Sequence, residues 1–370
     1  MFKLNMIIFR VWEIALVSLI LWSVGQVNGL KADEPRIWWG KVIWQKLTIK
    51  RVALLPLTPV PRPPTIREEK RGLRPFVYGG PNMAIVKGQK IYVVDDMYFV
   101  DDRKSKNKRK LLECSMEGKI LREIDFPKDA PEYPVGCLTL CNDLLWIGLE
   151  GPYAFAVDLN RWRVIKECRL KGEGRIVNLF VIPDGTLYAS MFFKRTEKWR
   201  ILWRIIKINP DGSYDEQVLE GWRPFYVDKN GVIYYYYLNR EIKLGYAKFG
   251  NSIKNFATIS ADDLGVSIID WVEFVGSIDA SFLFYTLSSI KVSKRSEFVG
   301  IELFFKVSRD GQVKVIGEHK FEMDPKGLPM AVRSVHLQHW SVYDGQIYYI
   351  GREDIGEHSR FWLMRLKSIK

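Results

Sequence analysis

Histidine is scarce in this chain of 370 residues, which contains four, and this limits the metal and acid–base chemistry that the sequence offers. His336 and His339 stand three residues apart in "VHLQHW", so on a strand their side chains point to opposite faces and are poorly placed to share a metal ion. No second cysteine or histidine pair has the spacing of a zinc site, so the metal interpretation is weak, and no G-x-S-x-G nucleophile elbow occurs. No feature of the sequence requires catalysis to explain it.

Cysteine is also sparse, and the four residues are Cys114, Cys137, Cys141 and Cys168. In an oxidising compartment four cysteines are able to form one or two disulfides, with three pairings to choose from. Cys137 and Cys141 lie on one expected strand, about 13 Å apart, which is too far for them to bridge each other. We expect one or both to pair with Cys114 and Cys168, and the sequence alone does not select the pairing.

Long apolar runs are absent apart from one of eleven residues at 14–24, and a membrane span needs about 20. This run follows the basic residues Lys3 and Arg10 and precedes "VNG" at 27–29, which ends in a small residue. The pattern resembles a secretory signal peptide. We expect residues 1–29 to be removed and the protein to be exported to the periplasm or the cell exterior. The alternative is that the segment is retained as a membrane anchor.

Helical periodicity is rare, whereas segments that alternate with period two are common. Several of these segments place an aromatic residue after a turn, as in "VIPDGTLYAS" (181–190), "VDKNGVIYYYY" (227–237) and "SVYDGQIYYI" (341–350). Six such residues recur about every 50 residues, close to the period of about 40–50 residues seen in radial repeats: Tyr92, Trp146, Tyr188, Tyr234, Phe284 and Tyr348. We expect these aromatic side chains to pack between repeating units rather than to bind a ligand.

Each unit carries a second turn, such as "SMEGKI" (115–120), "NPDGSY" (209–214) or "SRDGQV" (308–313). Glycine suits these hairpin turns because it adopts positive φ at low cost. One unit then consists of a strand, a tight turn, a strand, a longer loop, a strand, a tight turn and a strand, which is the content of one propeller blade. The sequence predicts an all-β, six-bladed β-propeller of four-stranded antiparallel blades over residues 75–370.

The "PDGTLY" turn at 183–188 and its relatives resemble the turns of six-bladed β-propellers of the NHL-like and TolB-like kind. The resemblance covers about 300 residues and identifies a superfold rather than a subfamily. No series of WD dipeptides, YWTD repeats or sialidase-type Asp-boxes is present. Propellers of this kind serve as scaffolds, peptide binders, lactonases, lyases and hydrolases, so the resemblance does not select a function.

The last unit, which ends with "RFWLMRLKSIK" (360–370), supplies three strands rather than four. Since an open sheet edge invites aggregation, we expect a strand from 41–50 or 51–57 to complete the blade and close the ring. Residues 30–74 would then form a closing strand and a proline-rich connector, "PLTPVPRPPT" (56–65), whose prolines favour an extended path.

The formal charge of +13 is concentrated in three loops at about 103–110, 191–200 and 288–298. Each is expected to join the second and third strands of a unit, so all three should project from one face. For an exported protein this favours an anionic partner, either an envelope polymer, lipid headgroups or an acidic protein, over nucleic acid. The predicted partner-binding residues are Arg103, Lys104, Lys106, Lys108, Arg109, Lys110, Lys194, Arg195, Trp199, Lys291, Lys294 and Arg295.

The mouth of the central channel is the alternative site, because the first strand of each unit begins there. Polar residues near those starts are Arg175, Asn178, Arg223, Asp270, Arg333 and His336. The alternative function is an enzyme at this site, either a metal-dependent lactonase or a lyase. A lactonase would need a Glu, an Asn and an Asp around a cation such as calcium. Asn178 and Asp270 could supply two oxygens, and no matching Glu is evident. Apart from that alternative, no cofactor is expected.

Overall fold

The computed structural model describes residues 47–61, 78–79, 83–99, 108–195, 201–291, 298–322, 340–355 and 358–368. Within these ranges the regular structure is almost entirely strand, and the one helical element is the short 3-10 helix η2 (Asp262–Leu264). None of the described segments forms a helix long and apolar enough for a membrane span. The expected leader, residues 1–29, lies outside the described residues.

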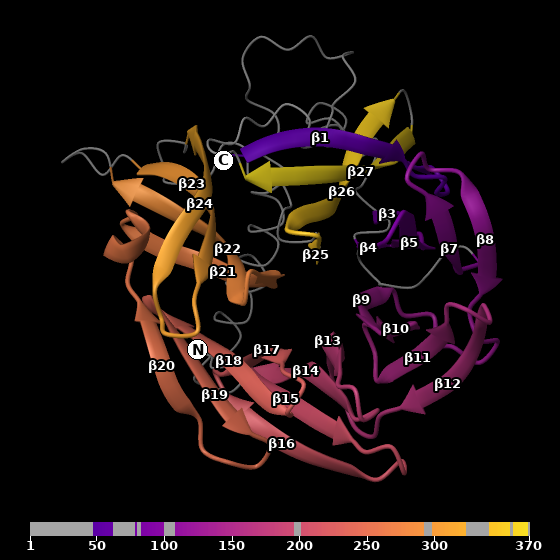
Figure 1. Cartoon of the computed structure of the whole chain (residues 1–370), viewed down its shortest axis with the longest axis horizontal. Helices are drawn as coiled ribbons and strands as arrows, with labels where there is room; N and C mark the ends of the chain where they lie inside the picture. The colour runs from indigo at the N-terminus through magenta and orange to yellow at the C-terminus, as the bar shows by residue number, and fades with distance from the viewer. Residues whose placement is uncertain are drawn as a thin grey trace, which may run out of the picture.

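Six antiparallel sheets follow one another along the chain and form a ring (Figure 1). Blade 1 contains β4 (Ala84–Lys87), β5 (Lys90–Asp95), β7 (Lys110–Ser115) and β8 (Ile120–Asp125). Blade 2 contains β9 (Val135–Cys141), β10 (Leu144–Leu149), β11 (Tyr153–Asp158) and β12 (Arg163–Arg169). Blade 3 contains β13 (Arg175–Val181), β14 (Leu187–Arg195), β15 (Ile201–Ile208) and β16 (Tyr214–Glu220).

The second half of the ring repeats this order. Blade 4 contains β17 (Arg223–Val227), β18 (Val232–Asn239), β19 (Glu241–Lys248) and β20 (Lys254–Ile259). Blade 5 contains β21 (Ile268–Ile278), β22 (Ser281–Lys291), β23 (Phe298–Val307) and β24 (Val313–Glu322). Blade 6 contains β25 (Ser341–Tyr343), β26 (Gln346–Ile355), β27 (His358–Ser368) and β1 (Leu47–Leu54). The chain is therefore a six-bladed β-propeller, as the turn pattern predicted.

The N-terminal strand β1 closes the ring as the outermost strand of blade 6 (Figure 1). It runs antiparallel to β27, with Leu47 opposite Ser368 and Leu54 opposite Trp362. The short strand β2 (Val60–Pro61) also pairs with β27, so part of the proline-rich segment joins the same sheet. Outside the blades, β3 (Tyr78–Gly79) pairs with β6 (Tyr98–Phe99). The prediction that a segment between residues 41 and 57 closes the ring is confirmed.

Aspartate–glycine turns reverse the chain within the blades, as expected. In blade 3 the Asp184 carboxylate accepts a hydrogen bond from the amide of Thr186 at 2.8 Å, and the amide of Gly185 donates to the carbonyl of Ile182 at 2.9 Å. Gly185 has φ +90°, a conformation that a residue with a Cβ rarely adopts. The second turn of the same blade repeats this arrangement at Asp211 and Gly212.

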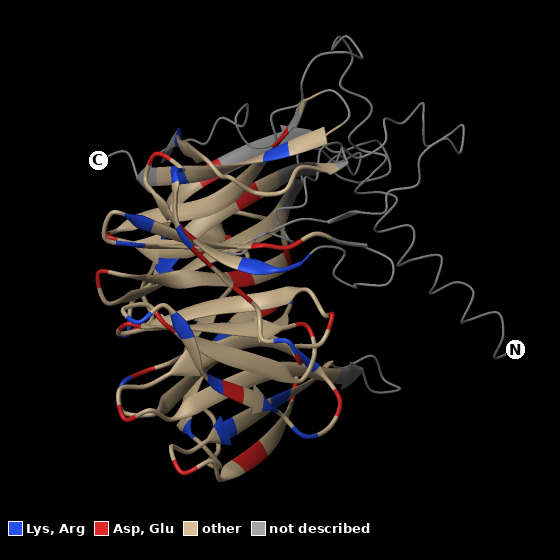
Figure 2. Ribbon diagram, turned by 90° about the vertical axis from the view of Figure 1, so that its right-hand side faces the viewer, with Lys and Arg blue, Asp and Glu red and all other residues tan. Residues whose placement is uncertain are grey.

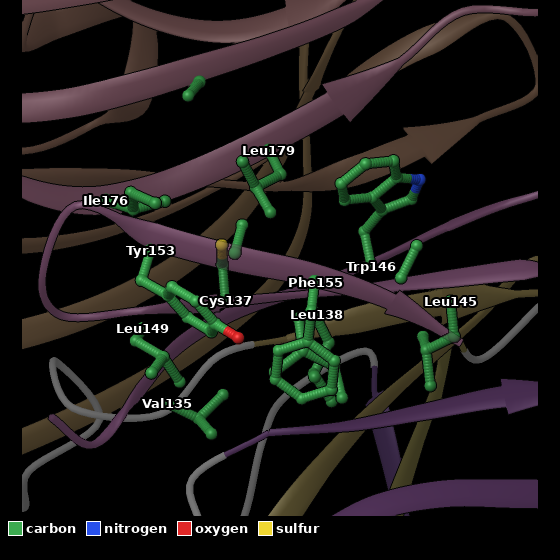
Figure 3. Close-up of a cluster of buried hydrophobic side chains, with 14 of the residues drawn as sticks. Val135, Cys137, Leu138, Leu145, Trp146, Leu149, Tyr153, Phe155, Ile176 and Leu179 are labelled. Atoms are coloured by element: carbon green, nitrogen blue, oxygen red, sulfur yellow. The ribbon is translucent and has the colours of Figure 1, made fainter. Parts of the chain in front are cut away.

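The six recurring aromatic residues all lie on the second strand of their blades, and five of them are buried. Trp146 on β10 belongs to a cluster that also contains Ile176 and Leu179 of blade 3 (Figure 3). Tyr92 on β5 lies in the same cluster, with its ring centroid 6.5 Å from that of Trp162 of blade 2. The prediction that these rings pack between neighbouring blades is confirmed.

The turn glycine Gly118 provides a test of how closely β1 is packed. It has φ +86°, and a Cβ there would overlap the carbonyl oxygen of Leu54 in β1. Gly212 has nearly the same φ, +87°, but a Cβ there would meet no atom within 4 Å. We expect Gly212→Ala to lower the free energy of unfolding by about 1 kcal/mol through backbone strain alone, and Gly118→Ala to lower it by roughly 3 kcal/mol through strain plus overlap. Urea denaturation measures both, and equal losses would contradict this placement of β1.

The four cysteines are all free thiols, which corrects the expected pairing of Cys137 or Cys141 with Cys114 and Cys168. Cys114 lies on β7 and Cys168 on β12, whereas Cys137 and Cys141 lie on the inner strand β9. Burial raises the pKa of the Cys114 thiol to about 11 and that of Cys137 to about 12, so both are uncharged at neutral pH. Strand pairing, rather than disulfide bonding, holds these segments together.

Candidate functional site: loop face and central cavity

The three basic loops occupy equivalent places in alternate blades. They join β5 to β7, β14 to β15 and β22 to β23, which are the second and third strands of blades 1, 3 and 5. The strand ends that flank these loops therefore lie on the face of the ring opposite the tight turns. Lys194 and Arg195 end β14, and Lys291 ends β22. The predicted residues Arg103, Lys104, Lys106, Trp199, Lys294 and Arg295 lie outside the described residues.

The end of the first basic loop contains side chains of two kinds. Lys108 lies two residues before β7 and forms an ion pair with Asp125, and Lys110 is the first residue of β7 and forms one with Glu123 at 2.8 Å. Arg109 between them is only 7% exposed. Its guanidinium donates to the carbonyls of Tyr133 at 2.6 Å and of Pro131 at 2.5 Å. Arg109 thus positions the segment that leads into blade 2, whereas Lys108 and Lys110 face solvent.

Charge on the described residues is mixed. Figure 2 shows Lys and Arg interspersed with Asp and Glu along the blades and turns. Acidic and basic residues are close to balanced over the described ranges, so most of the net charge of +13 belongs to sequence outside them. Any attraction of the protein for an anionic surface therefore depends chiefly on those other segments, which include most of the predicted basic residues.

A cavity of about 270 Å³ lies on the axis of the ring, where the innermost strands of the blades meet. All six blades contribute to its wall, from Met83 next to β4 to Trp340 next to β25. The residues that line it include the aromatic residues Phe180, Tyr226 and Phe274. Two predicted channel residues, Asn178 and Arg223, are also part of the wall, and so is one acid that the sequence did not single out, Glu273.

Glu273 carries a buried carboxyl group on β21, and its side chain is 8% exposed. Within the described ranges no group hydrogen-bonds to its Oε2. Burial raises its pKa from 4.5 to about 7, although the positive charge of Arg223 opposes the shift. A carboxyl group with a pKa near 7 changes its charge within the physiological range, which is more common at functional sites than elsewhere.

Arg223 is held in place by residues of blades 3 and 4. Its Nη1 donates to the hydroxyl of Tyr236 at 2.8 Å, and that hydroxyl donates to the carbonyl of Val272 at 3.2 Å. The guanidinium lies over the ring of Trp203, 4.9 Å from its centroid. The Nε–H group is buried and has no hydrogen-bond partner among the residues that the structure describes. The orientation of the guanidinium is fixed while one of its N–H groups stays unused.

The other predicted channel residues do not join the cavity wall. Arg175 at the start of β13 lies 3.9 Å from Glu150 and is half exposed. Asp270 lies at a bulge in β21 and is exposed, and desolvation by surrounding protein raises its pKa. Arg333 and His336 lie outside the described residues. Of the two oxygen donors predicted for calcium, only Asn178 lines the cavity, and no three acidic, histidine or cysteine side chains in the described ranges are grouped as metal ligands.

Glu273 is expected to destabilise the fold when it is ionised, and Glu273→Gln should reveal this. Because the folded-state pKa lies above that of the unfolded chain, the wild-type protein loses stability as pH rises from about 4.5 through 7. The shift from 4.5 to about 7 corresponds to roughly 3 kcal/mol. Glu273→Gln should therefore be more stable than the wild type by up to that amount at pH 8, with a smaller difference at pH 4.5. Urea denaturation at the two pH values measures this, and a pH-independent difference would contradict the assigned pKa.

Comparison with known proteins finds solved structures that share little sequence with this chain. No protein-family model and no curated protein matches the sequence. The β-propeller domain of Myceliophteria thermophila Cps50 (Swd1) is 10% identical with a TM-score of 0.40, over 77% of this chain and 88% of that one. The Trypanosoma rangeli sialidase is 8% identical with a TM-score of 0.46, and the match covers 87% of this chain and 60% of the sialidase. The WD40 domain of Neurospora crassa Pan2 is 8% identical with a TM-score of 0.38, and the match covers 85% of this chain and 95% of that domain.

Proposed function

We propose that this propeller is an exported binding module that recognises an anionic partner through the face carrying its basic loops. The partner classes are an envelope polymer, lipid headgroups or an acidic protein. The observation that supports the proposal best is the position of the three basic loops: each is the connection between second and third strands, in alternate blades of the ring. Such loops vary freely on a rigid scaffold, so a binding surface is readily built from them.

Solvent-facing charges, rather than Arg109, are expected to provide the attraction. Arg109 is engaged by backbone carbonyls, whereas Lys108 and Lys110 keep their ammonium groups at the surface, in ion pairs that solvent weakens. Interactions of this kind are screened by salt, so binding should weaken steeply as ionic strength rises.

Vesicle binding tests the proposal. Replacing Arg103, Lys104, Lys106, Lys108 and Lys110 by Gln should weaken adsorption to phosphatidylglycerol vesicles at low salt at least tenfold, since each basic residue near an anionic surface contributes about 1 kcal/mol. The wild type should not adsorb to phosphatidylcholine vesicles. The matched control replaces five exposed basic residues at or near the tight-turn face: Lys119, Arg161, Lys229, Lys248 and Lys314. Equal losses for the two variants would contradict a loop-face site.

An enzyme at the channel mouth is the second candidate, and Glu273 is the observation that favours it. A carboxyl group with a pKa of about 7 suits a general acid or base at neutral pH. The calcium-dependent version is not supported by the donor set, because Asp270 does not lie in the cavity wall with Asn178. Hydrolysis of a panel of lactones, compared between the wild type and Glu273→Gln, separates this candidate from a binding module.

A further inference from the structure

An arginine in a tight turn of blade 5 lies over three aromatic rings at the boundary with blade 4. Arg309 stands in the turn between β23 and β24. Its guanidinium carbon is 4.0 Å from the ring centroid of Phe282, 4.5 Å from that of Tyr234 and 5.4 Å from that of Tyr226. A cation within about 6 Å of a ring centroid, over the ring face, is attracted by the π electrons. No other cation in the described ranges lies over more than two rings.

The three rings surround one point instead of forming a stack. The planes of Tyr226 and Tyr234 are inclined at 48°, those of Tyr234 and Phe282 at 58°, and those of Tyr226 and Phe282 at 65°. The distances between their centroids are 5.8, 4.9 and 5.5 Å in the same order. Since no two rings are parallel and one cation lies over all three, their faces converge on that cation. Tyr226, Tyr234 and Phe282 are called the aromatic cage below.

The aromatic cage is partly accessible from solvent, near the tight turns. Phe282 is fully buried, whereas Tyr226 and Tyr234 are partly exposed. Burial raises the pKa of the Tyr234 hydroxyl, the charge of Arg309 opposes this shift, and the charge of Asp228 adds to it. An acidic group therefore lies close to the cage, where it favours a positively charged occupant.

Arg309 is able to leave the cage without disturbing the turn. Its side chain is exposed, and the turn is held by backbone hydrogen bonds that do not involve this side chain. The amide of Gly311 donates to the carbonyl of Ser308 at 3.0 Å, and the amide of Ser308 donates to the carbonyl of Gln312 at 3.0 Å. Rotation of the Arg309 side chain into water would therefore expose the ring faces of the cage while the backbone keeps its conformation.

We propose that the aromatic cage is a binding site for a quaternary ammonium group, and that Arg309 occupies it when no ligand is bound. The ligand class is a compound with a trimethylammonium head, such as choline. A quaternary ammonium has no N–H group, so ring faces alone satisfy it. A primary ammonium is strongly hydrated, and ring faces do not replace its water. The guanidinium is more weakly hydrated than an ammonium, which suits it to the same place.

Calorimetry on the full chain tests this proposal with three matched probes: choline, its neutral carbon isostere 3,3-dimethylbutan-1-ol, and ethanolamine. Arg309→Ala should bind choline roughly tenfold more tightly than the wild type, because the ligand no longer competes with the arginine. The neutral isostere and ethanolamine should each bind this variant roughly tenfold more weakly than choline does. Arg161 is exposed in the equivalent turn of blade 2, between β11 and β12, so Arg161→Ala is the control and should bind choline as the wild type does.

A second substitution assigns the site to the ring faces. In the Arg309→Ala background, Tyr226→Leu should weaken choline binding roughly tenfold, whereas Tyr226→Phe should retain it, because the ring and not the hydroxyl group makes the contact. Phosphatidylcholine vesicles separate the two sources of the head: adsorption of Arg309→Ala to them indicates a lipid, and binding of choline without adsorption indicates a soluble compound.

Neutralising the loop lysines should leave choline binding unchanged, so this proposal and the loop-face proposal fail separately. The cage proposal is overturned if Arg309→Ala does not bind choline at millimolar concentration. It is also overturned if this variant binds 3,3-dimethylbutan-1-ol as tightly as choline, or if Tyr226→Leu leaves choline binding intact. In each of these cases the contact of Arg309 with the rings would serve only to stabilise the turn.

Discussion

Removal of residues 1–61 is expected to leave a protein that aggregates and has lost its cooperative unfolding transition. The deletion removes β1 and β2 and exposes the edge of β27, where unpaired backbone groups are free to pair with another chain. It also removes the buried side chains of Ala53, Leu55, Leu57 and Val60. At about 1.5–3 kcal/mol for each large apolar side chain, the loss approaches the whole net stability of about 5–15 kcal/mol typical of a domain.

The matched control for this deletion removes only residues 1–46 and retains β1. This shorter deletion should leave the thermal unfolding transition and the oligomeric state unchanged. Both variants are compared with the full chain by calorimetry and size-exclusion chromatography. If the two deletions behave alike, whether both fold or both aggregate, β1 is not the element that decides closure of the ring.

Phe225→Ala is expected to lower the free energy of unfolding by about 3–5 kcal/mol, the range for deletion of a buried aromatic ring. Phe225 is 1% exposed and lies on β17 at the boundary between blades 4 and 5. Its ring centroid is 4.9 Å from that of Phe274, 5.1 Å from that of Phe282 and 5.2 Å from that of Phe284. Removing the ring leaves a void that these rigid strands cannot close. The variant therefore loses both the free energy gained by burying the ring and the ring's packing contacts.

Val218→Ala is the control for this measurement, because Val218 lies on the outer strand β16 and is 47% exposed. Its substitution should change stability by no more than about 0.5 kcal/mol. Urea denaturation of the two variants provides the comparison. A loss below about 1 kcal/mol for Phe225→Ala would show that blades 4 and 5 do not pack through this ring cluster.

The propeller fold was predictable because its signals are local. Each tight turn needs a residue that accepts positive φ, and glycines such as Gly185 and Gly212 mark these places in the sequence. Alternation with period two gave the strands between them. The closing strand was predictable by a different argument: the last repeat contained three strands, and an unpaired edge at β27 would have been unfavourable.

The cavity site was only partly predictable, because strand irregularities change which face a residue occupies. A bulge in β21 between Ile269 and Trp271 interrupts the alternation, so counting from the strand start does not show that Glu273 turns inward. The one local signal is an acid within the apolar run "DWVEFV" (270–275). Arg109 shows the opposite error. Its place in a lysine-rich run predicts an exposed charge, whereas its guanidinium is buried and donates to backbone carbonyls of the segment before blade 2.

Hydrogen exchange across β1 tests ring closure most directly. In the intact protein, amides of Leu47–Leu54 that donate to β27 should exchange as slowly as those of β26 and β27, because the three strands belong to one sheet. Mass spectrometry of peptic peptides resolves this segment from its neighbours. Slow exchange in all three strands is the result expected for a ring closed by its N-terminal strand. Rapid exchange throughout 47–54, with β26 and β27 still protected, would contradict it.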